Sequence, residues 1–372
     1  MQWVHSADWQ ATNKWKDLRQ ARKKRFYFAN CSMIIADFRS DTLTRPSPAM
    51  MKAMASAEVG DDVFEEDPTV NRLEILAASK FGMEASIFCA SGTMSNQIAV
   101  KAHTQPGDEV ICAINAHVYI YEGGGIAFNS GSQCTPLISD RGRINATQIS
   151  LAINPDDVHK ARTSLVCLEN TSNRGGGSCY QMSDIKSIRA VCDDQNLALH
   201  LDGARLFNAL IAKKESAEEY GRIFDSISVC LNKGLGCPIG SLLLGKKEFI
   251  RQARRIRKVF GGGMRQAGFM AACGIYALEN NVERLAIDHM RASQIAEVIS
   301  SKSFTKCVMP VETNIVILET TSEFPAQYVS ECLAKKGVRT IAIASNQLRF
   351  VTHLDITDAM MNHSLEIIRD FK

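Results

Sequence analysis

The chain has 372 residues, of which 45% are hydrophobic and 22% charged, as in an ordinary globular enzyme large enough for one large and one smaller domain. Seven of the 43 Lys and Arg residues and two of the 40 Asp and Glu residues lie within 1–35, which leaves 36 basic and 38 acidic groups in the other 337 residues. This slightly acidic body gives no bulk attraction for nucleic acid, and no apolar run is long enough to span a membrane.

The basic character belongs to the first 35 residues. Their apolar stretch is too weak for a secretory signal. An organelle transit peptide is an open alternative, although the segment is poor in serine. We predict a disordered or surface-lying extension over 1–35. Met33 lies just before the organised sequence "DFRSDT" and is an alternative start.

From about residue 50 the chain alternates between helix-like and strand-like segments. Helix-like stretches such as "NRLEILAASKFG" and "SDIKSIRAVCDDQN" separate six short apolar runs: "ASIFCA", "DEVICA", "SLVCLEN", "LALHLD", "SISVCLNK" and "SLLLG". Several runs are apolar on both faces, as in parallel strands buried between helices. This alternation predicts a doubly wound α/β sheet in a large domain over 36–275.

The last hundred residues have a different pattern. A long helical stretch from Gly268 to about Ser300 is followed by three strand-like runs, "NIVILET", "VRTIAI" and "QLRFVTH". We predict a smaller α+β domain over 276–372, to which the segment near 36–50 contributes.

Candidate functional residues follow three of the predicted strands, where ligands bind in open α/β sheets. Gly92 and Thr93 follow "ASIFCA" and begin a helix, so they form either an anion site or a plain turn. Asp202 ends "LALHLD" and either pairs with Arg205 or binds a ligand cation. Lys233 follows "SISVCLN" and is either a structural lysine or a nucleophilic amine.

The three candidate sites together are more informative than each one alone. An anion turn, a carboxylate and a lysine at successive strand ends would hold a phosphate, a ring-nitrogen cation and an aldehyde. Pyridoxal 5'-phosphate carries all three groups, and its sites contain a Schiff-base lysine and an acid at the pyridinium nitrogen.

The glycines and cysteines support no competing site. Triple-glycine stretches at 123–125, 175–177 and 261–263 fit no nucleotide-binding loop and indicate unusual backbone angles or close approach. The twelve cysteines form no C-x-x-C pair, which gives no support to a zinc or other metal site. They are typical of small buried residues in a reducing compartment, and we expect a cytoplasmic protein.

Seven motifs together are diagnostic of a family. "DFRSDTLTRPSPAM", "GDDVFEEDPTVNRLE", "SGTMSNQ", "NAHVYIYEGGG", "LHLDGARLFNA", "CLNKGLGCPIGS" and "RRIRKVFGGGMRQAG" resemble, in order, the motifs of the threonine aldolases. The resemblance runs from about Asp37 to the C-terminus. It implies a fold-type I pyridoxal-phosphate enzyme with a mostly parallel seven-stranded sheet, which cleaves L-threonine or L-allo-threonine to glycine and acetaldehyde.

The resemblance also implies a role for each matching residue. Lys233 would bind the cofactor covalently, Asp202 would keep the pyridine nitrogen protonated, and His117 would stack on the ring. The phosphate would be bound by Gly92, Thr93, Lys258 and Arg265, the last two from a neighbouring subunit of a homodimer or homotetramer. The substrate carboxylate would be clamped by Arg205 and Arg349, with Ser40 nearby.

One position departs from the family pattern. Many members carry a histidine in the segment written here "LENTSNRGGG", where Ser172 stands. That histidine is associated with the substrate β-hydroxyl, and serine is a poor general base. Water or His117 is the alternative base, and the preference between threonine and allo-threonine stays open.

Two other functions compete with this reading. One is a different pyridoxal-phosphate enzyme, either a β-eliminating lyase or an enzyme resembling serine hydroxymethyltransferase. The other is a non-catalytic pyridoxal-phosphate-binding protein whose basic extension is the working part. The intact set of Lys233, Asp202, Arg205 and Arg349 favours an enzyme.

Overall fold

The computed structural model describes residues 34–371. The predicted extension over 1–35 and the alternative start at Met33 therefore lie almost wholly outside the described residues. No helix within 34–371 combines the length and the apolar character needed to cross a membrane.

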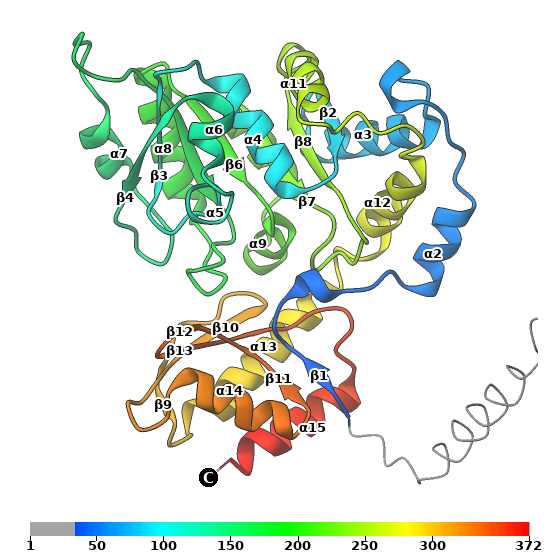
Figure 1. Cartoon of the computed structure of the whole chain (residues 1–372), viewed down its shortest axis with the longest axis vertical. Coiled ribbons are helices and arrows are strands. Elements are labelled where there is room, and N and C mark those ends of the chain that lie inside the picture. Colours follow the sequence, from blue (N-terminus) through cyan, green and yellow to red (C-terminus); the bar gives the residue numbers. More distant parts are fainter. Residues whose placement is uncertain (1–33, 372) are drawn as a thin grey trace, which may run out of the picture.

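A seven-stranded sheet forms the centre of the large domain (Figure 1). Its order is β2-β8-β7-β6-β5-β3-β4; β8 runs antiparallel to both neighbours and all other pairs are parallel. The predicted fold class is thereby confirmed. The strands are β2 Ala85–Cys89, β3 Glu109–Ala113, β4 Gln133–Leu137, β5 Thr163–Glu169, β6 Ala198–Asp202, β7 Ser226–Cys230 and β8 Ser241–Gly245.

Helices cover both faces of this sheet. On one face α4, α6 and α11 pack, and on the other α3, α8 and α10. The large domain contains α2 Pro48–Ala55, α3 Pro68–Phe81, α4 Gly92–His103, α5 His117–Ile120, α6 Gly125–Ser130, α7 Ala146–Ala152, α8 Met182–Asp194, α9 Leu206–Lys213, α10 Ala217–Ile223, α11 Lys247–Val259 and α12 Gly268–Asn280, with short 3₁₀ turns η1 Asp41–Leu43 and η2 Asp62–Phe64.

The C-terminal part forms an antiparallel sheet of order β12-β13-β10-β9. Its strands are β9 Thr305–Val308, β10 Ile315–Thr320, β12 Ile341–Ala344 and β13 Gln347–Val351, and its helices are α13 Leu285–Ser300, α14 Ala326–Lys335 and α15 Asp358–Arg369. The short strand β1 Ala36–Asp37 pairs in parallel with β11 Val338–Arg339, so the start of the described chain lies with the small domain.

Two details of the sequence prediction are wrong. The expected continuous helical stretch from 268 to about 300 is two helices, because the chain leaves the helix at Asn281, whose side chain donates to the Leu235 carbonyl (2.8 Å). The expected strand "VRTIAI" is split at Thr340, and its halves pair with different partners, β1 and β13.

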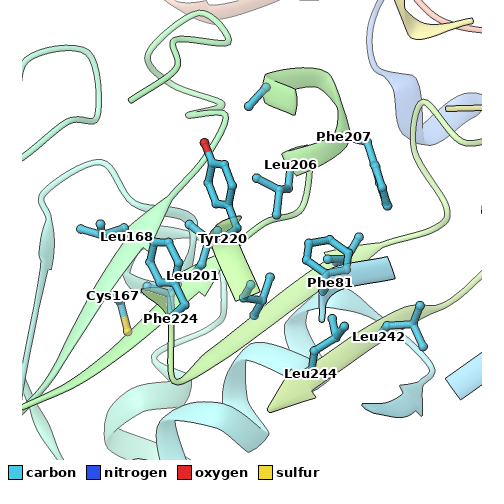
Figure 2. Packing of buried hydrophobic residues seen from close by; sticks show 14 of the residues in the cluster. Phe81, Cys167, Leu168, Leu201, Leu206, Phe207, Tyr220, Phe224, Leu242 and Leu244 are labelled. Carbon is cyan, nitrogen blue, oxygen red and sulfur yellow. The ribbon is translucent and has the colours of Figure 1, made fainter. Parts of the chain in front are cut away.

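Separate hydrophobic clusters hold the two sheets. The larger cluster fills the large domain, and Figure 2 shows part of it, with Tyr220 and Phe224 stacked at 6.1 Å and Phe81 meeting the edge of Phe207. A second cluster under the C-terminal sheet includes Phe38, which arrives from the N-terminal segment. Burying such large apolar side chains supplies most of the free energy that holds each sheet against its helices.

Candidate active site

The carboxyl ends of the parallel strands bring the predicted residues to one edge of the large sheet. Asp202 is the last residue of β6, Lys233 follows β7, and Gly92 begins α4 after β2. Figure 1 shows α5 and α9, which follow β3 and β6, on the side of the large domain that faces the small domain. The site therefore lies where the sheet edge meets the junction between the domains.

Lys233 is held by a tight turn. Gly236, at φ +80°, donates its N–H to the Lys233 carbonyl (2.9 Å), and Thr44 donates its hydroxyl to the same oxygen (2.9 Å). A positive φ of this kind favours glycine, which explains the glycine at position 236. The Lys233 amine lies 3.3 Å from the Cys230 thiol and is partly buried. A buried amine with so weak a partner is available to a ligand.

Asp202 is almost fully buried and belongs to a polar cluster. Its Oδ2 accepts a hydrogen bond from the Asn96 amide (2.9 Å), and its Oδ1 accepts one from the Ala204 N–H (3.1 Å). The same Asn96 nitrogen donates to Glu122 Oε1 (2.8 Å). Asn96 thus fixes two carboxylates at the sheet edge.

His117 begins α5 and is oriented by two glutamates. Its Nδ1 lies 2.9 Å from Glu122 Oε1, and its backbone N–H donates to Glu169 Oε2 (2.8 Å). Burial alone lowers the pKa of His117, but the hydrogen bond to Glu122 and the nearby Asp202 carboxylate outweigh it, so the pKa is raised. The other ring nitrogen, Nε2, makes no hydrogen bond within residues 34–371.

His117, Glu122 and Asp202 each place one ligand atom within 4.8 Å of the others, a grouping that could hold a metal ion. However, both N–H bonds of the Asn96 amide point at these carboxylates. A cation would have to displace these donors, so the arrangement suits a hydrogen-bonded organic ligand better than a metal.

Glu169 ends β5 beside Asp202, its neighbour in the parallel register. It accepts the backbone N–H groups of His117 and Asn173, both at 2.8 Å. Burial, followed by the Asp202 charge, raises the pKa of Glu169 to about 7. This carboxyl group therefore ties together two loops at the rim of the site.

Arg205 does not pair with Asp202, so that structural alternative is wrong. Its guanidinium instead makes two bonds to Asp41, from Nε (2.8 Å) and from Nη2 (2.7 Å), and both side chains are buried. Burial raises the pKa of Asp41, but Arg205 outweighs it and holds the pKa at about 2. Asp202 is thereby free to serve a ligand.

Arg349 reaches the same region from β13 of the small domain. Its Nη1 donates to the Asn173 side chain (2.7 Å) and its Nη2 to the Arg39 carbonyl (3.1 Å), while its buried Nε has no partner within 34–371. Burial, and then the Arg205 charge, lower the pKa of Arg349 to about 10. An anion bound beside Arg349 would offset both the burial of its guanidinium and the repulsion from Arg205.

Among residues 34–371, the Ser172 hydroxyl makes no hydrogen bond to Lys233, Asp202 or either arginine. It is 1% exposed, its Oγ accepts the Gly175 N–H (3.2 Å), and it lies directly against Gly142, where even a Cβ would come within 2.0 Å of that oxygen. Ser40 stands between β1 and Asp41, and its hydroxyl oxygen caps the Thr42 N–H (3.2 Å).

Lys258 and Arg265 flank the glycine-rich segment between α11 and α12. Arg265 pairs with Asp61 (2.7 Å), and Lys258 is exposed beside Gly263. Among residues 34–371, no hydrogen bond or ion pair joins either side chain to Lys233, Asp202 or Arg205. Their expected place in the phosphate site would need a second subunit, as the resemblance implies.

The sequence reasoning missed five residues that position the predicted ones. All are polar residues inside segments that the sequence analysis quoted, and Glu169 also ends a strand, so their polar character was a readable signal: Asp41, Asn96, Glu122, Glu169 and Asn173. It also described several of the strand-like runs as apolar on both faces, whereas the runs of β6 and β7, "LALHLD" and "SISVC", contain alternating polar residues.

The chain resembles known proteins in sequence over most of its length. A sequence profile described as beta-eliminating lyase matches residues 37–323. The chain is 43% identical over 322 residues to a low specificity L-threonine aldolase of Escherichia coli strain K12, covering 86% of this chain and 94% of that protein. A low specificity L-threonine aldolase of Saccharomyces cerevisiae is 39% identical over 308 residues, covering 82% of this chain and 78% of that protein.

The solved structures agree on the fold. A threonine aldolase from Leishmania major superposes with a TM-score of 0.78 at 19% identity, covering 90% of this chain and 98% of that one.

Proposed function

The chain belongs to the family of beta-eliminating lyases and threonine aldolases, which are pyridoxal 5'-phosphate-dependent lyases, and we propose that it cleaves L-threonine and L-allo-threonine to glycine and acetaldehyde. One observation carries the proposal beyond the family. Lys233, Asp202 and two arginines from different domains converge on one edge of the sheet.

The residues present fit pyridoxal 5'-phosphate. Lys233 offers a partly buried amine bonded only to a thiol, and Asp202 keeps lone pairs beyond the two that it uses. The first backbone hydrogen bond of α4 runs from the Ser95 N–H to the Ser91 carbonyl. The N–H groups of Gly92 and Thr93 come before it and have no partner in the helix, so they suit a phosphate. His117 presents a flat ring whose side chain is 30% exposed, as stacking on a ligand requires.

When bound, the cofactor supplies an electron sink for the negative charge left on Cα. The protein's own residues have other tasks. Lys233 would hold the cofactor covalently, and the Asp202 carboxylate would keep its ring nitrogen protonated, which strengthens the sink where charge develops.

Arg205 and Arg349 would bind the substrate carboxylate. Asp41 uses only two of the five N–H donors of Arg205, and Arg349 has a buried Nε without a partner. A carboxylate placed between them would satisfy the free donors and reduce the repulsion between the guanidinium groups. With Ser40 at the rim, this clamp would orient the bond between Cα and Cβ.

The base that takes the β-hydroxyl proton cannot be Ser172, because its oxygen is buried and bonded to the Gly175 N–H. We assign this step to His117, with water as the alternative. Burial lowers the pKa of His117, but the hydrogen bond to Glu122 and the Asp202 charge outweigh it, so the pKa is raised. A higher pKa makes the neutral imidazole a stronger base.

The assembly and compartment are also proposals. A homodimer or homotetramer would bring Lys258 and Arg265 of one subunit to the phosphate of the next. The eleven cysteines within the described residues are all free, including Cys112 and Cys134, whose sulfur atoms are 3.4 Å apart. Unlinked sulfurs at this distance suit a reducing compartment such as the cytoplasm.

Replacement of Lys233 tests the function. Lys233→Ala should abolish acetaldehyde release from both L-threonine and L-allo-threonine, whereas Lys186→Ala, at a surface pair with Glu219, should leave it unchanged. Acetaldehyde release by Lys233→Ala at the wild-type rate would contradict the proposal. Release of 2-oxobutanoate and ammonia in place of acetaldehyde and glycine by the wild-type enzyme would instead indicate a β-eliminating lyase.

A further inference from the structure

A buried polar layer lies between α4 and the large sheet. Four alternating side chains of β6 and β7 are polar and face α4, while Leu199, Leu201, Ile227 and Val229 on the opposite face enter the hydrophobic core. The members from the sheet are at most 2% exposed: His200, Asp202, Ser226 and Ser228. Burying so many polar groups is costly unless they are bonded to one another, so their connections are informative.

Asn96 sits in the middle of this layer, and its orientation is fixed. Its amide nitrogen donates to both Asp202 Oδ2 (2.9 Å) and Glu122 Oε1 (2.8 Å), so its Oδ1 must accept. The atom facing Asn96 Oδ1 is His200 Nε2, at 3.2 Å. His200 therefore carries its proton on Nε2.

This tautomer also fixes the role of Nδ1, the other ring nitrogen of His200. Burial, with the nearby His103, lowers the pKa of His200 to about 3, so the ring is neutral and Nδ1 is an acceptor. The Ser226 hydroxyl, 2.8 Å away, donates to Nδ1. Ser226 Oγ then accepts from His103 Nε2, also at 2.8 Å, and burial lowers the pKa of His103 to about 4.

Every donor in this chain consequently points toward Asp202. The order is His103, Ser226, His200, Asn96 and then the carboxylates of Asp202 and Glu122. The chain is not a proton conduit, because the Asn96 amide cannot pass a proton from one side to the other. Its physical effect is orientation, reinforced because bonds aligned in one direction polarise one another.

We propose that His200 is a positioning residue for the reaction: by donating to Asn96 Oδ1 it locks the amide, and so aims the Asp202 carboxylate at the ligand site. This inference deepens the proposed function and rests on it, since Asp202 matters as the partner of the cofactor ring nitrogen. His200 itself touches neither substrate nor cofactor in this arrangement.

Two substitutions of His200 test the N–H donor at the Nε2 position separately from the imidazole ring. His200→Gln can place an amide N–H near the position of Nε2 and keep the bond to Asn96. His200→Asn reaches only as far as Nδ1, so it can keep Ser226 but loses the bond to Asn96. The dissociation constant of the apoprotein for pyridoxal 5'-phosphate, measured by equilibrium dialysis, should rise on the order of ten-fold in His200→Asn and only slightly in His200→Gln.

His289 provides the matched control. It is also a part-buried histidine whose Nε2 contacts an asparagine oxygen, Asn208 Oδ1 at 3.0 Å, but it lies on α13 outside the polar layer. His289→Asn and His289→Gln should both bind the cofactor like the wild type. Equal affinities in His200→Asn and His200→Gln would overturn the proposal.

A second measurement needs no cofactor and no folded variant. Long-range proton–nitrogen NMR of the wild-type apoprotein should show His200 neutral and protonated on Nε2, and a proton on Nδ1 would overturn the proposal. A wrong proposed function would give a different experimental result from a wrong role for His200. In that case the wild type itself would not bind pyridoxal 5'-phosphate, while the tautomer of His200 would still be as inferred.

Discussion

The buried pair between Asp41 and Arg205 gives a quantitative prediction for Asp41→Asn. The pKa of Asp41 is about 2 against an ordinary value of 3.8, which corresponds to about 2 kcal/mol of stability at neutral pH. The substitution also leaves Arg205, only 7% exposed, without its counter-charge. Removing one partner of a buried ion pair costs about 3–5 kcal/mol, and we expect a loss in that range.

The contribution of Asp41 to the free energy of unfolding depends on pH with a definite sign. Below 3.8 the unfolded chain takes up a proton at Asp41 that the folded chain refuses until the pH approaches about 2, so stability falls with pH in this window. Asp41→Asn lacks this contribution. The difference in unfolding free energy between wild type and variant should therefore be constant from pH 7 to about 5 and shrink as the pH falls toward 2.

Urea unfolding of both proteins across this pH range is the assay, with Asp37→Asn as the control. Asp37 also pairs with an arginine, Arg39 at 2.7 Å, but in a pair whose side chains are 46% and 23% exposed. Such surface pairs contribute about 0–1 kcal/mol. If Asp41→Asn were no less stable than Asp37→Asn, the anchoring role given to Asp41 would be wrong.

Two further predictions concern the substrate. Asn173→Ala removes the acceptor of Arg349 Nη1 and should raise the KM for L-threonine on the order of ten-fold with a smaller change in kcat; an unchanged KM would contradict the carboxylate role of Arg349. His117→Phe keeps a flat ring but no base, so kcat should fall by about 10²–10⁴ while cofactor absorbance is retained, and a wild-type kcat would assign the base to water. Ser172→Ala is its control and should stay within about two-fold of wild type, because the Ser172 hydroxyl is buried away from the site.

The fold could be predicted wherever strands were central and apolar. The strands β4 and β9 were missed, and both lie at the edge of their sheets. An edge strand pairs on one side only, so it tolerates residues such as Pro136 in "QCTPL" and Lys306 in "TKCV" that hide the strand pattern. Sequence pattern follows burial, and the edges are the least buried parts of a sheet.

The site could be predicted only in part, for a related reason. Asp202 and Lys233 were found because a strand end is a local feature of the sequence. The partners of the arginines are distant, since Asp41 lies 164 positions before Arg205 and Asn173 lies 176 positions before Arg349. Such pairs depend on how the domains pack together, and no local pattern encodes that packing.

These distant pairs place the carboxylate clamp under the control of the domain junction. Arg205, on the large domain, is held by Asp41 from the segment that runs with the small domain. Arg349, on the small domain, is held by Asn173 from the loop after β5 of the large domain. Asp202 is held within the large domain by Asn96 and Ala204. The Lys233 carbonyl accepts the Thr44 hydroxyl from the N-terminal segment, but it also accepts the Gly236 N–H of its own turn. A change in domain packing should therefore displace both arginines together and weaken amino-acid binding, while the cofactor stays in place.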